Sequence, residues 1–206
     1  MTSIYIKEGT QLPKRREFDL YETPAGKAWD GLSVVVDDLI RSGDAFDPDT
    51  DVRILDPGAG AGIWGACCRN LWPQAWIAGV ELREVRPADA YDQWVTGEFN
   101  EVTLTDPAPG TWDLVVGNPP YREAQSFLRA GLHYLRPGGR LLYLLRLAFL
   151  EGKGRGCGLF REQPVKRVEV CMSRPSFTAN GKTNATSFAF FLWEKGFAGE
   201  PTLGWR

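Results

Sequence analysis

Short apolar runs recur along the chain and indicate buried strands. Each run holds about four to eight residues, rich in Val, Ile, Leu, Phe or Trp, and ends at a polar or glycine-rich segment. The predicted strands cover residues 52–55, 75–80, 112–116, 141–147, 165–170 and 186–193. Residues 88–95 give a weaker pattern, which we interpret as a helix leading into a further strand.

Helical spacing of apolar residues separates most of these runs. The first predicted helix has Thr23 as N-cap and Pro24 at its first position, and it ends at Gly43. Further helices are predicted over residues 63–71 and 127–135, the latter closed by a Pro-Gly-Gly turn. The apolar face predicted for the first helix comprises Trp29, Leu32, Val36, Leu39 and Ile40.

This alternation predicts an α/β fold. We expect a Rossmann-like, mostly parallel sheet of seven strands with helices on both faces. The last two strands have no helical pattern between them, so they are predicted to form an antiparallel pair at one edge. The 206 residues fit a single domain over residues 1–206, with residues 1–20 as an N-terminal extension.

Composition and charge narrow the function classes. The net charge of −2 excludes a uniformly basic surface, so any nucleic-acid site must be a local patch. No apolar run approaches the length of a membrane span, and the first residues lack the core of a signal peptide. The four cysteines form no CxxC pair, so we expect reduced thiols in a cytoplasmic protein and no metal site.

A glycine-rich segment between the strand at 52–55 and the helix at 63–71 predicts a cofactor loop. Its residues are Asp56, Pro57, Gly58, Ala59, Gly60, Ala61 and Gly62. Ligands of open parallel sheets bind at the carboxyl ends of the strands, where Glu81 also lies and is placed to accept hydrogen bonds from a ribose. The alternative is a purely structural tight turn that packs against the sheet and binds no ligand.

Two cofactor classes fit this loop. Gly60, Gly62 and Gly65 also satisfy the GxGxxG pattern of dinucleotide sites, so NAD is an alternative. Asp56 favours S-adenosylmethionine, because its carboxylate would repel a pyrophosphate but suits a ligand that carries an ammonium and a sulfonium.

Asn118, Pro119, Pro120 and Tyr121 follow the strand at 112–116 and are the predicted catalytic residues. Prolines fix their φ angles and remove N–H donors, which leaves rigidly placed carbonyls. The Asn118 side-chain oxygen and the Pro119 carbonyl are suited to hold an NH2 group, while Tyr121 is suited to stack on a flat substrate. The alternative is a stiff turn that merely ends a strand.

Together these segments resemble the class I, S-adenosylmethionine-dependent N6-adenine DNA methyltransferases, and more narrowly the small single-domain forms of phages and prophages. The resemblance runs from about Tyr21 to Trp193. It implies the class I methyltransferase fold, S-adenosylmethionine as cofactor, DNA as partner and the host cytoplasm as location. The cofactor residues that it implies are Tyr21, Thr23, Pro24, Asp56, Gly58, Ala59, Gly60, Gly62, Glu81, Glu98, Phe99 and Asn118.

The resemblance also implies how the substrate is held. Phe177, in an Arg-Pro-Ser-Phe segment, matches the aromatic residue that packs on an extruded base, and Tyr121 is expected to stack with it. Arg174 and Lys182 are further candidate substrate contacts. No separate target-recognition domain is expected, so recognition would rest on residues 152–164 and 173–185, be relaxed, or come from a partner.

Other substrates remain open. The same Asn-Pro-Pro-Tyr motif occurs in methylases of RNA exocyclic amines and of a protein glutamine amide, since all three substrates present a planar NH2 group. A binding module without turnover and an NAD-dependent oxidoreductase are rivals of other classes. The sequence leaves duplex against single-stranded DNA, and the oligomeric state, undecided.

A basic segment lies towards the carboxyl end. Residues 151–164 are glycine-rich and are predicted to form a mobile loop. Six Lys and Arg residues against three Glu residues give the region a local charge of +3, which predicts phosphate contacts or merely a solvated loop. The basic residues are Lys153, Arg155, Arg161, Lys166, Arg167 and Arg174.

Overall fold

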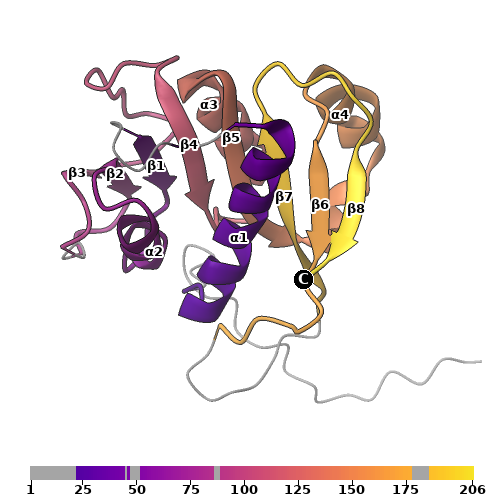
Figure 1. Ribbon diagram of the computed structural model, residues 1–206, viewed down its shortest axis with the longest axis horizontal. Coiled ribbons are helices and arrows are strands. Elements are labelled where there is room, and N and C mark those ends of the chain that lie inside the picture. Colours follow the sequence, from indigo (N-terminus) through magenta and orange to yellow (C-terminus); the bar gives the residue numbers. More distant parts are fainter. Residues whose placement is uncertain (1–21, 45, 47–51, 86–88, 178–185) are drawn as a thin grey trace, which may run out of the picture.

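A computed structural model describes residues 22–44, 46, 52–85, 89–177 and 186–206. They form an eight-stranded sheet with helices on both faces (Figure 1). The strand order is β3-β2-β1-β4-β5-β7-β6-β8. The strands are β1 (Arg53–Pro57), β2 (Trp76–Glu81), β3 (Gln93–Thr96), β4 (Trp112–Gly117), β5 (Leu135–Arg146), β6 (Arg167–Val170), β7 (Phe188–Glu194) and β8 (Thr202–Trp205).

The predicted fold class is confirmed. Neighbouring strands from β3 to β5 pair in parallel, and β7 pairs antiparallel to both β5 and β6. The structure adds an eighth strand, β8, which pairs in parallel with β6 and is outermost at this end of the sheet. The sequence pattern missed β8 because it has only four residues, and all of them are exposed or half-buried.

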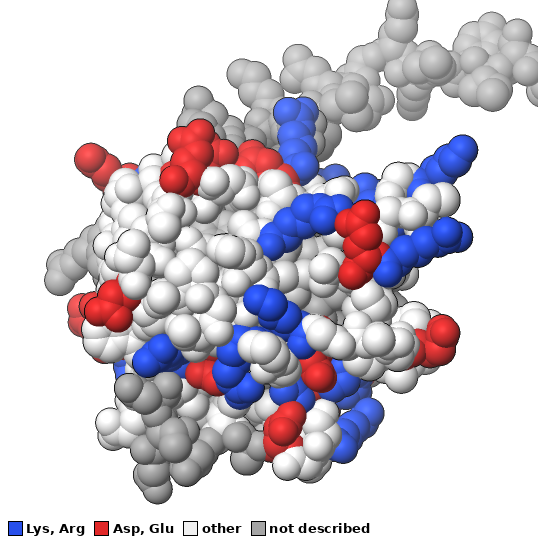
Figure 2. Space-filling model, turned by 90° about the horizontal axis from the view of Figure 1, so that it is seen from above, with Lys and Arg blue, Asp and Glu red and all other residues white. Residues whose placement is uncertain are grey.

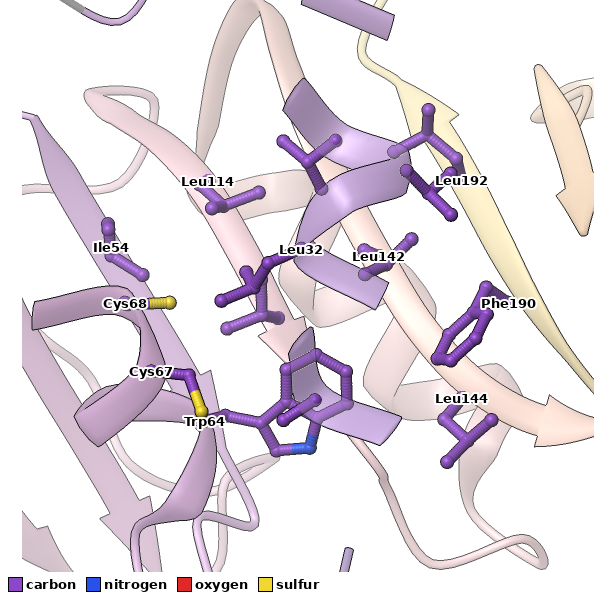
Figure 3. Close-up of a cluster of buried hydrophobic side chains, with 14 of the residues drawn as sticks. Leu32, Ile54, Trp64, Cys67, Cys68, Leu114, Leu142, Leu144, Phe190 and Leu192 are labelled. Atoms are coloured by element: carbon purple, nitrogen blue, oxygen red, sulfur yellow. The ribbon is translucent and has the colours of Figure 1, made fainter. Parts of the chain in front are cut away.

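Helices cover the sheet on two sides. α1 (Ala25–Ser42) and α2 (Ile63–Leu71) pack on one face, and α3 (Ala124–Tyr134) packs on the other (Figure 1). Figure 3 shows the hydrophobic cluster under α1 and α2, where Trp64 lies among leucine side chains of the sheet and of α1. Shorter turns follow β5: η2 (Leu147–Leu150), η3 (Arg155–Leu159) and α4 (Phe160–Glu162).

The buried face of α1 differs from the predicted one. Trp29 and Ile40 were expected to face the core, but they are 41% and 71% exposed. Leu32 and Leu39 are buried, as predicted. The inward face also includes Gly31, where a Cβ would lie 2.7 Å from the Trp64 ring of α2 and 3.0 Å from side-chain atoms of Leu142 and Phe190 in the sheet. The prediction, which relied on large apolar residues, missed this glycine, whose missing side chain permits the close packing.

Two further expectations were wrong. Residues 151–164 were predicted as a mobile loop, but they contain the helical turns η3 and α4, with Leu159 only 1% exposed. Residues 89–92 form no helix before β3. In both places the structure relies on a few long-range contacts that have no periodic pattern in the sequence.

Buried charges tie the end of α1 to the sheet at the amino ends of the strands. Arg140 of β5 is 2% exposed and donates to Asp38 at 3.2 Å and to Asp44 at 2.6 Å. Lys166 binds Asp38 at 2.8 Å and Glu194 at 2.7 Å. Figure 2 looks onto this edge and shows basic and acidic side chains side by side. The charges here neutralise one another.

The described helices contain no segment that is both long and apolar enough to cross a membrane.

Arg140→Ala is expected to lower the free energy of unfolding by about 3–5 kcal/mol, because it leaves the buried Asp38 carboxylate without this partner. Urea denaturation measures the change. Arg129→Ala is the control: its ion pair with Glu162 is exposed, so we expect a loss of about 1 kcal/mol or less. Equal losses in the two variants would contradict the role given to Arg140.

Candidate active site

A large cavity lies at the carboxyl ends of the parallel strands. It has a volume of about 750 Å³, within the range of small-molecule sites. Loops that follow β1, β2, β3 and β4 form its walls, together with the start of α1 and the start of α2. The lining includes these predicted residues: Thr23, Gly58, Ala59, Gly60, Gly62, Glu81, Glu98, Phe99, Asn118 and Pro120.

The glycine-rich loop is held against β2 by its backbone. The N–H groups of Gly58 and Ala59 donate to the Val80 carbonyl at 2.8 and 3.0 Å. The Gly60 N–H donates to Oε2 of Glu81 at 2.8 Å. Gly60 has φ of +59°, and an added Cβ would meet no atom within 4 Å. The requirement for glycine here is therefore conformational, and the cavity side of the loop is open.

Glu81 is fixed by three donors. It is 6% exposed, and besides the Gly60 N–H it accepts the Arg83 N–H at 3.2 Å and Arg83 Nε at 2.8 Å. A carboxylate held in this way at a cavity wall has a defined orientation for a ligand hydroxyl. The predicted ribose contact remains a prediction, and Arg83 is a neighbour that the sequence analysis missed.

Asp56 lies behind the loop. It is fully buried, is absent from the cavity lining, and accepts a hydrogen bond from the Tyr91 hydroxyl at 2.6 Å. Burial raises the pKa of this carboxyl to about 7, while the bond from Tyr91 lowers the pKa and the charge of Glu81 raises it. Asp56 therefore acts on the site from beneath the loop, and the predicted contact with a cofactor amino group remains untested.

Gly65 explains how Tyr91 reaches Asp56. A Cβ at Gly65 would lie 2.3 Å from the Tyr91 ring and 2.5 Å from its hydroxyl oxygen. The third glycine of the GxGxxG pattern thus makes room for the tyrosine that binds the buried carboxylate. This packing role needs no dinucleotide.

The Asn-Pro-Pro-Tyr loop begins where β4 ends. Asn118 and Pro120 line the cavity, whereas Pro119 and Tyr121 do not. The Pro120 carbonyl accepts the Glu123 N–H at 2.9 Å, which starts the turn into α3. Of the two proline carbonyls, the one of Pro120 is thus used within the loop, and the acceptor role predicted for Pro119 is compatible with this arrangement.

The segment after β3 closes another wall. Glu98 and Phe99 both line the cavity. Phe99 is only 3% exposed, and its ring centroid lies 5.2 Å from that of Phe127, which also lines the cavity. The geometry provides a carboxylate beside an aromatic wall, which suits a planar ring that carries an amino group.

The predicted residues near α1 differ in whether they line the cavity. Thr23 lines the cavity, and its hydroxyl oxygen accepts a hydrogen bond from Trp64 Nε1 at 3.3 Å. Pro24 caps α1 outside the lining, and Tyr21 lies outside the described residues. Glu22 lines the cavity but was not predicted.

The predicted substrate residues are not gathered on the cavity. Phe177 is 5% exposed and packs edge-on against Phe188, whose ring centroid lies 5.8 Å from that of Tyr121. Arg174 is exposed, and Lys182 lies outside the described residues. In this conformation Phe177 belongs to the core, so stacking on a base remains a prediction.

Several lining residues were missed, although each is close in sequence to a predicted one or was assigned to the core. Arg122 and Glu123 follow the Asn-Pro-Pro-Tyr motif directly, and Arg83 follows Glu81 by two positions. The missed residues include Glu22, Arg83, Arg122, Glu123 and Phe127.

Sequence comparison finds distant relatives. No protein-family model matches the chain. The ribosomal RNA small subunit methyltransferase C of Pasteurella multocida is 25% identical over 143 residues, which cover 64% of this chain and 43% of the relative. The same enzyme of Salmonella choleraesuis is 25% identical over 154 residues, which cover 64% and 45%. The chain thus spans less than half the length of these curated relatives.

Structure comparison supports the fold. A structure of a type I R-M system aligns with a TM-score of 0.62 at 16% identity, covering 89% of this chain and 44% of the other. A Listeria monocytogenes protein, provisionally classed as a class I S-adenosylmethionine-dependent methyltransferase, aligns with a TM-score of 0.59 at 14% identity, covering 85% and 64%. The chain therefore has the Rossmann-like fold of class I methyltransferases.

Gly65→Ala is expected to lower the free energy of unfolding by about 1–3 kcal/mol, because the new methyl group overlaps the Tyr91 ring. Thermal or urea unfolding measures the loss. Gly26→Ala is the control: a Cβ there meets no atom within 4 Å, so in the first turn of α1 we expect no loss. A stable Gly65→Ala protein would show that Tyr91 moves aside freely.

Asp56 should make stability fall as pH rises from about 4 to about 7. The folded carboxyl has a pKa of about 7, against an ordinary aspartate pKa of 3.8, so between these values the folded state holds a proton that the unfolded state has released. The lost stability is on the order of 4 kcal/mol at most. Denaturant unfolding of the wild type and Asp56→Asn from pH 4.5 to 8 tests this. Only the wild type should show this decrease, and parallel curves would contradict it.

Proposed function

We propose that this chain is an S-adenosylmethionine-dependent methyltransferase that methylates a planar NH2 group of a nucleic-acid base. One observation carries the proposal: Asn118, the predicted acceptor-holding residue, lines the same cavity as the glycine-rich loop and Glu81. Methyl transfer requires the donor and the acceptor to lie in contact. The glycine-rich loop, suited to hold the donor, and the loop at Asn118, suited to hold the acceptor, line one cavity.

The residues present fit the cofactor. The cavity of about 750 Å³ has carboxylates at Glu22, Glu81 and Glu98 and an aromatic wall at Phe99, which suits a ligand with a ribose, an amino-bearing ring and cationic groups. The open face of the loop at Gly60 lets a ligand approach the backbone. When bound, S-adenosylmethionine supplies an electrophilic methyl group on a sulfonium.

The chain's own contribution is to orient the acceptor. The Asn118 side-chain oxygen and the Pro119 carbonyl accept the two protons of the NH2 group, which keeps the nitrogen lone pair from delocalising into the ring. Transfer then relies on positioning and on stabilising the charge that develops on the amine. A strong general base is not required, because the amine proton becomes acidic after transfer.

The finer substrate assignment is N6 of adenine in DNA. The Asn-Pro-Pro-Tyr motif, the segment near Tyr21 and the segment at Arg174–Phe177 support it through their resemblance to the adenine enzymes. Tyr121 and Phe177 would hold an extruded base, which requires Phe177 to leave its contact with Phe188.

RNA is the second candidate. It is favoured by the names of the curated relatives, which are ribosomal RNA methyltransferases. Incubation with labelled S-adenosylmethionine and, separately, duplex DNA, single-stranded DNA, RNA and a release factor separates the candidates. N6-methyladenine in DNA would support the finer assignment. Label in RNA would show that the substrate is RNA and would leave the role of Asn118 unchanged. Label in a glutamine amide would overturn the nucleic-acid proposal.

Asn118→Ala should reduce methyl transfer by about 100-fold or more while cofactor binding survives, since the lost group acts on the acceptor. Single-turnover assays with labelled cofactor measure transfer, and equilibrium dialysis measures cofactor binding. Asn100→Ala is the matched control, because Asn100 is exposed and its side chain donates a hydrogen bond to the Ser126 hydroxyl, away from the cavity lining. Transfer at the wild-type rate by Asn118→Ala would overturn the assignment.

A further inference from the structure

A smaller cavity lies at the end of the Asn-Pro-Pro-Tyr loop, where Tyr121 and Arg122 line it. Its volume is about 190 Å³, and its wall is formed by the end of that loop, the end of β5 and the turns that follow β5. Arg122 lines both this cavity and the large one, so the two spaces adjoin at the residue after Tyr121. Whatever occupies the small cavity therefore lies next to the acceptor position.

The small cavity is basic. Arg122, Arg146 and Arg155 line it, and the described residues of its lining include no Asp or Glu. Arg155 is held by carbonyl oxygens, with Nε 2.8 Å from the Phe149 carbonyl oxygen. Three cations around a space of this size, with no anion among the lining residues, fit an anionic ligand.

Arg146 carries the inference. Its guanidinium carbon lies 4.6 Å from the centroid of the Tyr121 ring. Its Nε is buried and makes no hydrogen bond within the described part of the chain, and no carboxylate in that part forms an ion pair with it. A buried arginine donor without an acceptor is costly unless a ligand supplies one.

The other buried basic residues are different. Arg140 is paired with Asp38 and Asp44. Arg167 also has a buried nitrogen, Nη1, without a hydrogen bond in the described part of the chain, but its guanidinium is paired with Glu169. Within the basic segment, Lys166 also binds Asp38. Carboxylates inside the protein neutralise these charges. The Arg146 guanidinium instead lies over the Tyr121 ring, which carries no negative charge.

We propose that Arg146, supported by Arg122 and Arg155, binds a backbone phosphate of a nucleic acid beside the nucleotide whose base reaches Asn118. This deepens the proposed function and rests on it. An arginine fork matches phosphate oxygens, and every nucleotide carries a phosphate on the sugar that holds its base. A glutamine side chain has no such anion, so this site selects nucleic acid over protein.

The site also limits how Tyr121 works. Arg146 covers the Tyr121 ring, so drawing the guanidinium onto a phosphate would uncover that ring. Backbone binding is thus coupled to exposure of the aromatic surface predicted to stack on the substrate. Arg146 is a specificity residue and takes no part in the chemical step.

The test measures binding without cofactor and without turnover. Fluorescent single-stranded oligonucleotides, DNA and RNA, each with one central adenine among pyrimidines, are titrated with the full chain and followed by anisotropy. Arg146→Ala should weaken binding about tenfold or more. The slope of log affinity against log salt should fall by about 0.7, as for one lost phosphate contact on a single strand. Arg146→Lys should recover part of the affinity.

Arg129→Ala is the matched control, because Arg129 is exposed, pairs with Glu162 and lies outside the small cavity. Its binding should equal that of the wild type. Thermal unfolding of each variant and cofactor binding by equilibrium dialysis check that Arg146→Ala remains folded. If that variant fails to fold, Arg122→Ala and Arg146→Lys give the same comparison.

A neutral linkage locates the phosphate. Oligonucleotides with one methylphosphonate on either side of the adenine are compared in the wild type and Arg146→Ala. At one linkage the two proteins should bind equally, because the charge that Arg146 contacts has already been removed. Unchanged affinity and salt slope in Arg146→Ala, or a full effect of the variant at every neutral linkage, would overturn the proposal.

The outcomes separate this proposal from the one on which it rests. Arg146-dependent binding without methyl transfer to any substrate would support the phosphate site and overturn the enzymatic role. Methyl transfer to a release-factor glutamine, with no nucleic-acid binding, would keep the transfer and overturn the phosphate site.

Discussion

The close approach of β1 and β4 at their carboxyl ends is the constraint on which the rest of the site depends. The two strands pair in parallel at Ile54–Leu114 and Leu55–Val115. A Cβ at Gly117, where β4 ends, would lie 3.3 Å from the Pro57 carbonyl oxygen and 3.5 Å from Oδ1 of Asp56. Because glycine stands there, the loop that begins at Asn118 starts beside the glycine-rich loop, and one cavity serves both.

The same approach places a carboxylate inside the protein. Asp56 sits beneath the glycine-rich loop, where burial works against its charge and the Tyr91 hydroxyl supports it. Tyr91 can reach it because Gly65 has no side chain. The buried Asp56 carboxylate is thus only partly compensated by the Tyr91 hydroxyl, and its burial costs stability when it is charged.

Much of the fold followed from local pattern, and the failures have a common cause. The bounds of α2 and the position of the Asn-Pro-Pro-Tyr loop after β4 agree with the sequence prediction, since strand runs, prolines and glycines act locally. The exposure of Trp29 and the burial of Phe177 depend on packing between segments distant in sequence. Whether a carboxylate lies near Arg146 likewise depends on the tertiary structure, in which the described residues provide none, and periodicity carries no such information.

Tyr121 packs against both hydrophobic clusters, the one under α1 and α2 and the one under α3. Most side chains of a layered fold belong to one layer, so over evolutionary time each layer drifts by compensating changes within itself. Tyr121 contacts both layers, so a change in the packing of one layer at this position also affects the other. A change of side chain at position 121 must therefore be accommodated on both faces of the sheet at once, which couples the packing of the two layers at the predicted catalytic loop.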